Sequence, residues 1–417
     1  MGLSNPAAAQ QDTYGQFIPY SSIATGYETP VLTPSGSETK TCWGSVVKSG
    51  STYHMFYSYN PTGGANAKIG HATSSDGKTW TKDAANNPVL DVGSGGKFDD
   101  KQVWLPIVWI EGSTWYMIYA GQKNADSHVA IGLATSSDGV NWTRQNSGDP
   151  VLEGDSGEWD QNNAEIGTVI KVGSTYYMWY NTITSSPRKI GLATSTDLIN
   201  WTKDENNPIF EAASSNAGRF CPGIFKLSDW YYLIVPAYTH QTDYVEFEMY
   251  RSANPTFYES ERVYLGSIRR TSRNRLNSTD MDTPFILTDD INRDSFDCTN
   301  GDIWCYYAAY DHGADWHTGL MVSAKSPIMP AIDNRFTARD GFGLGFFGKI
   351  AVGQQSGSDP FPSRELDINA SRIRVRGYET IASAGASGSI GEICWDANYL
   401  YISVGTNNWH RVAHASW

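Results

Sequence analysis

The stretch IGLATSSDGVNW, at residues 131–142, occurs three times in nearly the same form. The other two copies are IGHATSSDGKTW, at residues 69–80, and IGLATSTDLINW, at residues 190–201. Consecutive copies lie roughly sixty residues apart, and self-similarity at a fixed period is the signature of a repeat architecture. The sequence therefore predicts a fold that is assembled from several copies of one unit.

Each copy follows a pair of apolar, aromatic-rich runs that are joined by a short glycine-containing segment. The three joining segments are KSGST, IEGST and KVGST, at residues 48–52, 110–114 and 171–175. Glycine suits the tight loop of a β-hairpin, and Val, Ile, Tyr and Trp suit a pleated surface. Each copy also precedes a proline-containing stop: NNPVL, GDPVL and NNPIF, at residues 86–90, 148–152 and 206–210. One unit is therefore predicted to contain four antiparallel strands, as a propeller blade does.

Weaker versions of the unit continue the chain. A fourth is predicted from residues 223–238 and 245–257, and a fifth from residues 283–311 and 318–327. The stretch ETPVL, at residues 28–32, has the proline stop without its preceding phrase, so it is expected to complete the last unit. The predicted fold class is all-β, a five-bladed β-propeller at residues 27–350 after an N-terminal extension at 1–26.

The shared wording of the repeat has a structural explanation. In SSDGKTW and SSDGVNW, Asp and Gly are expected to form a turn, while Trp packs between neighbouring blades. Asp76, Asp138 and Asp197 are therefore interpreted as turn residues and not as catalytic groups. Asp99 and Asp160 recur in the matching segments FDDKQ and WDQNN, which predicts a structural role for these two as well.

Composition excludes several classes of function. The formal net charge of −13 disfavours binding to nucleic acid, whose phosphates would be repelled. No run of 18 apolar residues is present, so membrane insertion is not expected. The five cysteines form no CxxC pair and are expected to be free, buried thiols, with Cys298 and Cys305 facing each other across a hairpin as the alternative. No secretory signal peptide is apparent, and the basic stretch at residues 267–275 is interpreted as a solvated loop.

With five units, SSDGxxW turns and YYMWY-type second strands, the sequence resembles the five-bladed propeller glycoside hydrolases of families 43, 32, 62, 117 and 130. The resemblance covers roughly residues 27–350. It implies cleavage of glycosidic bonds by acidic residues at the axial mouth, where the inner strands begin. That chemistry needs two carboxyl groups across a sugar, one to protonate the leaving oxygen and one to activate water or attack.

Aligning the five inner strands gives one candidate pair. Their first positions are Cys42, Trp104, Glu165, Phe220 and Asp282. Family 43 carries its general acid here in the third blade, as Glu before Gly-Pro. Glu165, in AEIGTV, is similar without the proline and is predicted to be the acid. The family base, an Asp one position on in the first blade, is replaced by Trp43, and its pKa-modulating Asp by Ile107.

The catalytic base therefore has to come from elsewhere. The family 32 signatures WMNDPNG and RDP are also absent. Asp100 and Asp282 lie at or just before inner strands and are not explained by the repeat, so they are the candidates for base or sugar ligand. The predicted catalytic residues are Glu165, Asp282 and Asp100.

Loops after the second strands are expected to reach the same axial face. The predicted substrate-binding residues are Trp43, Trp104, Tyr59, Gln122, Asn181, Arg219, His240, Asp311, His312 and Trp316. In YDHGADWH, at residues 310–317, Trp316 is expected to stack on a sugar. A metal site formed by Asp311, His312, Asp315 and His317 is the alternative. No cofactor is expected, with a structural divalent cation at the axis as the alternative.

The C-terminal part differs in composition. Residues 351–364 are a predicted linker, and residues 365–417 a small β module. Its segment GSIGEICWDANYLYISVGTNNWHRV resembles a module at the ends of bacteriophage tail fibres and tailspikes. The resemblance implies a virion protein, a homotrimer, and a host surface glycan as partner. Three functions follow: a phage-borne glycoside hydrolase, a non-catalytic glycan-binding receptor module, and a free cellular glycosidase of family 43 type. A cellular enzyme would be cytoplasmic, or exported without a visible signal peptide.

Overall fold

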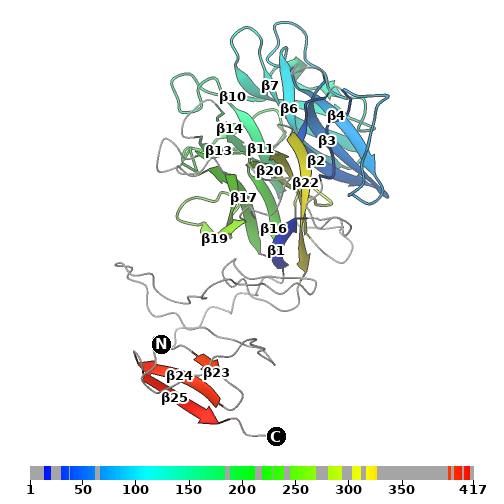
Figure 1. Cartoon of the computed structure of the whole chain (residues 1–417). Coiled ribbons are helices and arrows are strands. Elements are labelled where there is room, and N and C mark those ends of the chain that lie inside the picture. Colours follow the sequence, from blue (N-terminus) through cyan, green and yellow to red (C-terminus); the bar gives the residue numbers. More distant parts are fainter. Residues whose placement is uncertain are drawn as a thin grey trace. The chain divides into compact units, whose positions relative to one another are not determined.

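Repeated antiparallel hairpins form the fold (Figure 1). The computed structural model describes residues 14–19, 30–36, 38–61, 66–183, 188–211, 218–227, 229–238, 245–268, 280–293, 303–310, 316–325, 393–395, 399–405 and 408–413. Throughout these ranges the regular structure is β-strand, apart from one short 3-10 turn at Asn146–Gly148. None of the described residues belongs to a helix long enough to cross a membrane. The protein divides into two compact units, Met1–Phe342 and Gly343–Trp417.

The first three repeats each form one blade of the first unit. Blade one contains β2 (Lys40–Ser49), β3 (Thr52–Asn60), β4 (Lys68–Ser74) and β5 (Thr81–Lys82). Blade two contains β6 (Gln102–Glu111), β7 (Thr114–Gln122), β8 (Val129–Ser136) and β9 (Thr143–Arg144), with β10 (Leu152–Glu153) beside β8. Blade three contains β11 (Glu165–Val172), β12 (Thr175–Asn181), β13 (Ile190–Ser195) and β14 (Thr202–Lys203). The hairpin glycines Gly50, Gly112 and Gly173 all have φ near +60°, as the tight loops require.

The two weaker repeats form the remaining blades. Blade four contains β15 (Gly218–Arg219), β16 (Gly223–Leu227), β17 (Trp230–Tyr238), β18 (Val245–Ser252) and β19 (Val263–Ile268). Blade five contains β20 (Asp280–Ile286), β21 (Ile303–Tyr310) and β22 (Trp316–Lys325). The first strands β2, β6, β11, β16 and β20 contact one another in this order, and β20 contacts β2 again. This closed cycle is compatible with five blades around one axis.

N-terminal residues close the ring, as the isolated ETPVL predicts. Leu32 forms an antiparallel bridge with Thr318 of β22. The equivalent stop residues Leu90 and Phe210 bridge the third strands of blades one and three in the same way. In addition, β1 (Tyr14–Pro19) pairs antiparallel with β22. Blade five is therefore built from both ends of the first unit, which links the start of the sequence to its last repeat.

The turn that follows each third strand confirms the structural interpretation of its aspartate. Asp138 Oδ1 accepts hydrogen bonds from the backbone N–H groups of Val140 and Asn141, each at 2.8 Å. The same pair of bonds recurs at Asp76 and at Asp197. Trp142 packs edge-on against Phe56 of blade one, with ring centroids 5.5 Å apart. The repeated phrase thus sets a turn and a blade-to-blade contact.

A second repeated carboxylate supports the outer part of the blades. Asp160 is buried, and its Oδ2 accepts from the Tyr180 hydroxyl at 3.0 Å and from Lys203 Nζ at 2.7 Å. Asp99 is likewise buried and accepts from Tyr119 and Arg144. Both aspartates are held by a tyrosine of the second strand and a cation of the fourth, which confirms their structural role.

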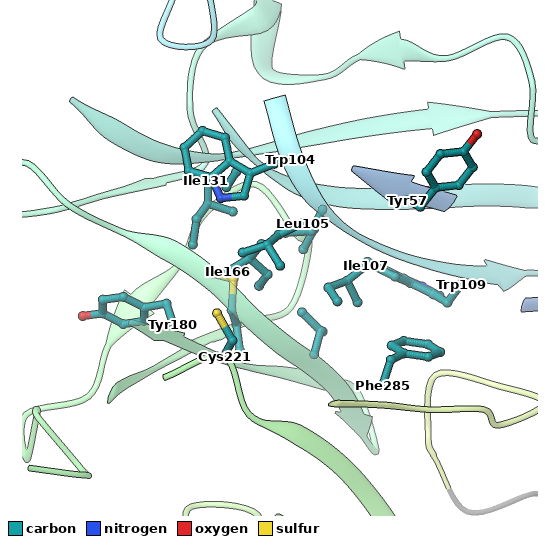
Figure 2. Close-up of a cluster of buried hydrophobic side chains, with 14 of the residues drawn as sticks. Tyr57, Trp104, Leu105, Ile107, Trp109, Ile131, Ile166, Tyr180, Cys221 and Phe285 are labelled. Carbon is teal, nitrogen blue, oxygen red and sulfur yellow. The ribbon is translucent and has the colours of Figure 1, made fainter. Parts of the chain in front are cut away.

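Large apolar side chains fill the space between the inner strands. Trp104, Leu105, Ile166 and Cys221 converge from neighbouring blades, and the Tyr180 hydroxyl points away from this cluster (Figure 2). The core of the first unit therefore places the starts of the inner strands around one centre.

The second unit contains an antiparallel sheet of β23 (Ile393–Trp395), β24 (Tyr399–Gly405) and β25 (Asn408–Ala413).

Candidate functional site

A bulge at the start of the inner strands matches the aligned register. In four of the five strands, the residue after the aligned first position has a positive φ: Trp43 (53°), Leu105 (52°), Cys221 (37°) and Thr283 (50°). The ladder to the second strand also shifts register here in β2, β6, β11 and β20. Bulges of this kind turn a side chain out of the pleat and are frequent beside active sites.

Glu165 is the best-enclosed carboxyl group of this region. Its side chain is only 6% exposed. Oε1 accepts a hydrogen bond from Trp104 Nε1 at 2.6 Å, and Oε2 accepts one from Asn181 Nδ2 at 2.8 Å. The Cys221 thiol lies 3.6 Å from Oε2. Burial raises the pKa of Glu165 despite these donors, which is the direction that a general acid requires.

Asp282 lies at the equivalent position of blade five. Its Oδ1 accepts a hydrogen bond from the Thr283 hydroxyl at 2.9 Å. Burial raises the pKa of Asp282 to about 6, and the negative charge of Glu165 adds to the rise. Glu165 and Asp282 are therefore within electrostatic reach of each other, although they come from strands far apart in sequence. Two coupled carboxyls titrate as a pair, with one proton held more tightly than the other.

Arg188 is a residue of the site that the sequence analysis missed. Its guanidinium lowers the pKa of Glu165 and of Asp282 and so opposes the effect of burial on both. It stands 4.6 Å from the ring centre of Phe220, the first position of blade four. The sequence did hold a signal. Two residues before the repeated Ile-Gly, the other copies have the buried residues Ala67 and Val129, whereas the third copy has an arginine.

Asp100 has a different environment from the other two predicted catalytic residues. Its oxygens accept hydrogen bonds from the backbone N–H groups of Gly96 and Asn124, both at 2.7 Å. These bonds lower the pKa of Asp100. They join the segment before β6 to the segment after β7, so the contacts favour a loop-holding role. Glu165 and Asp282 are the pair that the structure couples.

Two predicted sugar ligands surround Glu165. Trp104 is 5% exposed and donates to Glu165, while Asn181 is fully buried and also accepts from the Cys221 backbone N–H at 2.9 Å. Both side chains therefore hold the carboxyl in place from β6 and β12. Gly167 permits this packing, because a Cβ there would lie 2.9 Å from the Trp179 carbonyl oxygen and 2.6 Å from Pro222.

Trp43 and Trp316 form an aromatic pair at the junction of blades one and five. Their ring centroids lie 5.6 Å apart with an interplanar angle of 50°. Lys40 Nζ lies 5.3 Å from the Trp43 ring centre, and Lys40 pairs with Trp316 across the two strands. Both residues are partly exposed, so an aromatic surface and a cation lie together beside the inner strands.

The other predicted ligands have partners of their own. Tyr59 is buried, and burial raises its pKa to about 12. Gln122 accepts from Gln102 at 2.7 Å and donates to the Ser127 carbonyl. Arg219 forms a two-bond ion pair with Glu248, at 2.7 and 3.1 Å. His240, Asp311, His312 and Asp315 lie outside the described residues.

Other sites in the described part of the protein do not compete with this one. Within those ranges, no group of three or more His, Cys, Asp or Glu side chains is arranged to hold a metal ion. A surface hollow is lined by Asn206, Pro208, Ile209, Tyr258, Glu259 and Ser260. Neither Glu165 nor Asp282 takes part in it, so the coupled carboxyl pair remains the candidate active site.

Comparison with known proteins supports the fold. The profile of the Glycosyl hydrolases family 32 N-terminal domain matches residues 27–160. No curated protein sequence matches this one. A family 117 glycoside hydrolase of the marine bacterium Zobellia galactanivorans superimposes with a TM-score of 0.55 at 13% identity, over 78% of this protein and 94% of its own length.

Two further solved structures have the same fold. The catalytic domain of a Coprinopsis cinerea GH62 α-L-arabinofuranosidase gives a TM-score of 0.51 at 14% identity, over 72% of this protein and 97% of its own length. A BT0996 RGII complex gives a TM-score of 0.57 at 16% identity, over 72% and 92%, respectively. At these identities the likeness concerns the fold alone, and it confirms the predicted all-β propeller class.

Proposed function

We propose that the protein is a glycoside hydrolase in which Glu165 is the general acid and Asp282 the base. The observation that carries the proposal is that two carboxyls with raised pKa values, the buried Glu165 and the partly exposed Asp282, interact electrostatically at aligned positions of blades three and five. The family 32 domain match and the glycoside hydrolase neighbours support a carbohydrate substrate, as does the neighbour in complex with RGII.

The proposed reaction divides the work between the two carboxyls. Glu165, whose pKa is raised by burial, gives its proton to the glycosidic oxygen as the bond from the anomeric carbon breaks. Asp282, with a pKa of about 6, is ionised near neutral pH and takes a proton from the water that attacks that carbon. Trp104 and Asn181 position Glu165 through its two oxygens. No cofactor is required for this reaction.

A glycan-binding module without catalysis is the second candidate function. Glu165 is only 6% exposed, and Trp104 donates a hydrogen bond to one of its oxygens, which limits the access of a substrate to the carboxyl group. The first-blade position that holds the base in family 43 is Trp43. Such a protein would use the Trp43–Trp316 surface to hold a sugar and would release no product.

The setting of this activity is also a proposal. The C-terminal segment that resembles phage tail modules suggests a tail-borne homotrimer that meets bacterial surface polysaccharide, with localisation in the virion. A free cellular glycosidase remains the alternative. The molar mass of the full-length protein in solution, measured by light scattering, checks the trimer: three times the mass of one copy supports it, and the mass of one copy contradicts it.

Release of reducing ends from bacterial surface polysaccharides tests the catalytic role. We expect Glu165→Gln to lower kcat by about 10²–10⁴-fold while the unfolding temperature stays close to that of the unaltered protein, because the amide keeps the size of the side chain. Asp155→Ala, which removes an exposed carboxylate of blade three, is the control and should keep full activity. Binding of a glycan without any release of reducing ends would replace the hydrolase by the second candidate.

A further inference from the structure

Arg188 is a charged residue at a position where the repeat calls for a small apolar one. Ala67 and Val129, its counterparts in blades one and two, are 5% and 1% exposed. All three residues use their carbonyl oxygen in the same way, to accept from the N–H near the start of the next inner strand: Val103, Ala164 and Arg219, respectively. The backbone role is thus shared, and the guanidinium is an addition specific to the third copy.

Arg188 acts on Glu165 and Asp282 through its charge and not through a direct ion pair. Its guanidinium lies over the Phe220 ring and forms no ion pair with a described residue. Arg219, thirty-one residues further on, is instead neutralised by a two-bond pair with Glu248. The face of the partly exposed guanidinium stacks on Phe220, which leaves the N–H donors along its edge directed away from the ring and able to reach a ligand.

Lys40, at the start of β2 in blade one, provides a second cation. It also makes no ion pair with a described carboxylate, and its Nζ lies over the Trp43 ring. Lys40 and Asp282 both act on the Cys42 thiol, Lys40 lowering its pKa and Asp282 raising it. Lys40 therefore belongs to the same electrostatic neighbourhood as the candidate active site. Trp43 Nε1 is buried and has no hydrogen-bond partner among the described residues.

On the basis of the proposed function, we infer that the site accepts a carboxylate-bearing sugar, such as a uronic acid residue, with Arg188 and Lys40 as its carboxylate ligands. Arginine binds a carboxylate through two parallel N–H···O bonds, and ion pairs of this type are stronger than bonds between neutral groups. The protein has a net charge of −13, so an acidic glycan would be repelled by most of its surface. Two cations without an ion-pair partner among the described carboxylates would offset that repulsion where the sugar binds.

Matched acidic and neutral ligands test this inference. The probes are oligogalacturonides, oligoalginates and glucuronate-containing capsular oligosaccharides, each compared with its carboxyl-reduced form, by calorimetric binding to the full-length protein carrying Glu165→Gln. We expect at least tenfold tighter binding of an acidic form than of its reduced counterpart. Adding Arg188→Gln should weaken the acidic ligand by about 10–100-fold and the reduced ligand by less than about threefold.

Two controls separate the outcomes. Lys97→Gln removes a cation of an exposed rim pair with Asp149 and should leave both affinities unchanged. Equal affinity for acidic and reduced ligands, or equal weakening of both by Arg188→Gln, would overturn the inference and leave the proposed hydrolase intact. Failure of every acidic and neutral glycan, including arabinan, xylan and mannan fragments, to bind or to be cleaved would overturn the proposed function itself.

Discussion

The carboxylates at the rim of the blades and those at the start of the inner strands lie in opposite environments. Rim aspartates such as Asp138 recur in every clear copy of the repeat and accept bonds from backbone N–H groups, which lower their pKa. Glu165 and Asp282 do not recur, and burial raises the pKa of both. Repetition thus marks carboxylates that stabilise the fold. Departure from the repeat is not sufficient for a role in chemistry, because Asp100 also departs from it and holds a loop.

The difference has a simple physical origin. A carboxylate that receives several N–H or cationic donors is stabilised in its charged form, so it contributes to folding stability when ionised. A carboxyl taken out of water with few compensating charges is destabilised when ionised. Removing charge should therefore have opposite effects on stability at the two places.

The largest of these effects is expected at the buried rim aspartates. In Asp160→Ala, the Lys203 ammonium and the Tyr180 hydroxyl lose a shared acceptor inside the blade, and we expect a loss of about 3 kcal/mol in the free energy of unfolding. Chemical denaturation followed by tryptophan fluorescence measures it.

Asp155 supplies a matched control for that experiment. It binds the same Lys203 at 2.8 Å, but its side chain is 62% exposed. Asp155→Ala should therefore cost less than about 1 kcal/mol. Equal losses in the two variants would mean that burial does not decide how much each of these carboxylates contributes to stability.

Periodicity made most of the fold predictable. The spacing of the repeated phrase, the hairpin glycines and the proline stops locate the first three blades, and ETPVL correctly predicts the closure at Leu32 and Thr318. The recurrence of similar sequences around Asp99 and Asp160 correctly predicts a structural role, because each copy of a repeated unit needs the same stabilising contacts.

The candidate site was less predictable, because its residues come from different blades and approach one another only when the ring is closed. Aligning the inner strands brought out Glu165 and Asp282 as acidic first positions. The contact of Trp104 with Glu165 joins two blades and has no sequence signal. Arg188 was missed because it lies before a third strand, outside the inner strands that were aligned. The partners of Asp100, Tyr59, Gln122 and Arg219 depend on loop conformation, which a single sequence does not specify.

Neutralising Asp282 should increase the free energy of unfolding, whereas removing Asp160 should decrease it. The folded-state pKa of Asp282 is about 6, above its ordinary value of 3.8, so the ionised group opposes folding above pH 6. We expect Asp282→Asn to raise the free energy of unfolding by roughly 2 kcal/mol at about pH 8, with the gain disappearing as the pH falls to about 4. Denaturation at both pH values measures the gain. A loss of stability at the higher pH would show that Asp282 is a supporting carboxylate like those of the rim.

The smallest effect is expected at the repeated turn. Asp138→Ala removes an acceptor from the N–H groups of Val140 and Asn141, which are exposed enough for water to replace it, so a loss of about 1 kcal/mol is expected. Asp138→Asn keeps an amide oxygen in the place of Oδ1 and should recover about half of that loss. Asp76 makes the same two bonds in blade one, so the loss in Asp76→Ala should match that in Asp138→Ala within about 0.5 kcal/mol. The two losses should add in the double variant, because the turns lie on different blades. Thermal unfolding of the single and double variants measures both quantities. A much larger loss in one blade than in the other would mean that the same turn sequence contributes differently to stability in the two blades.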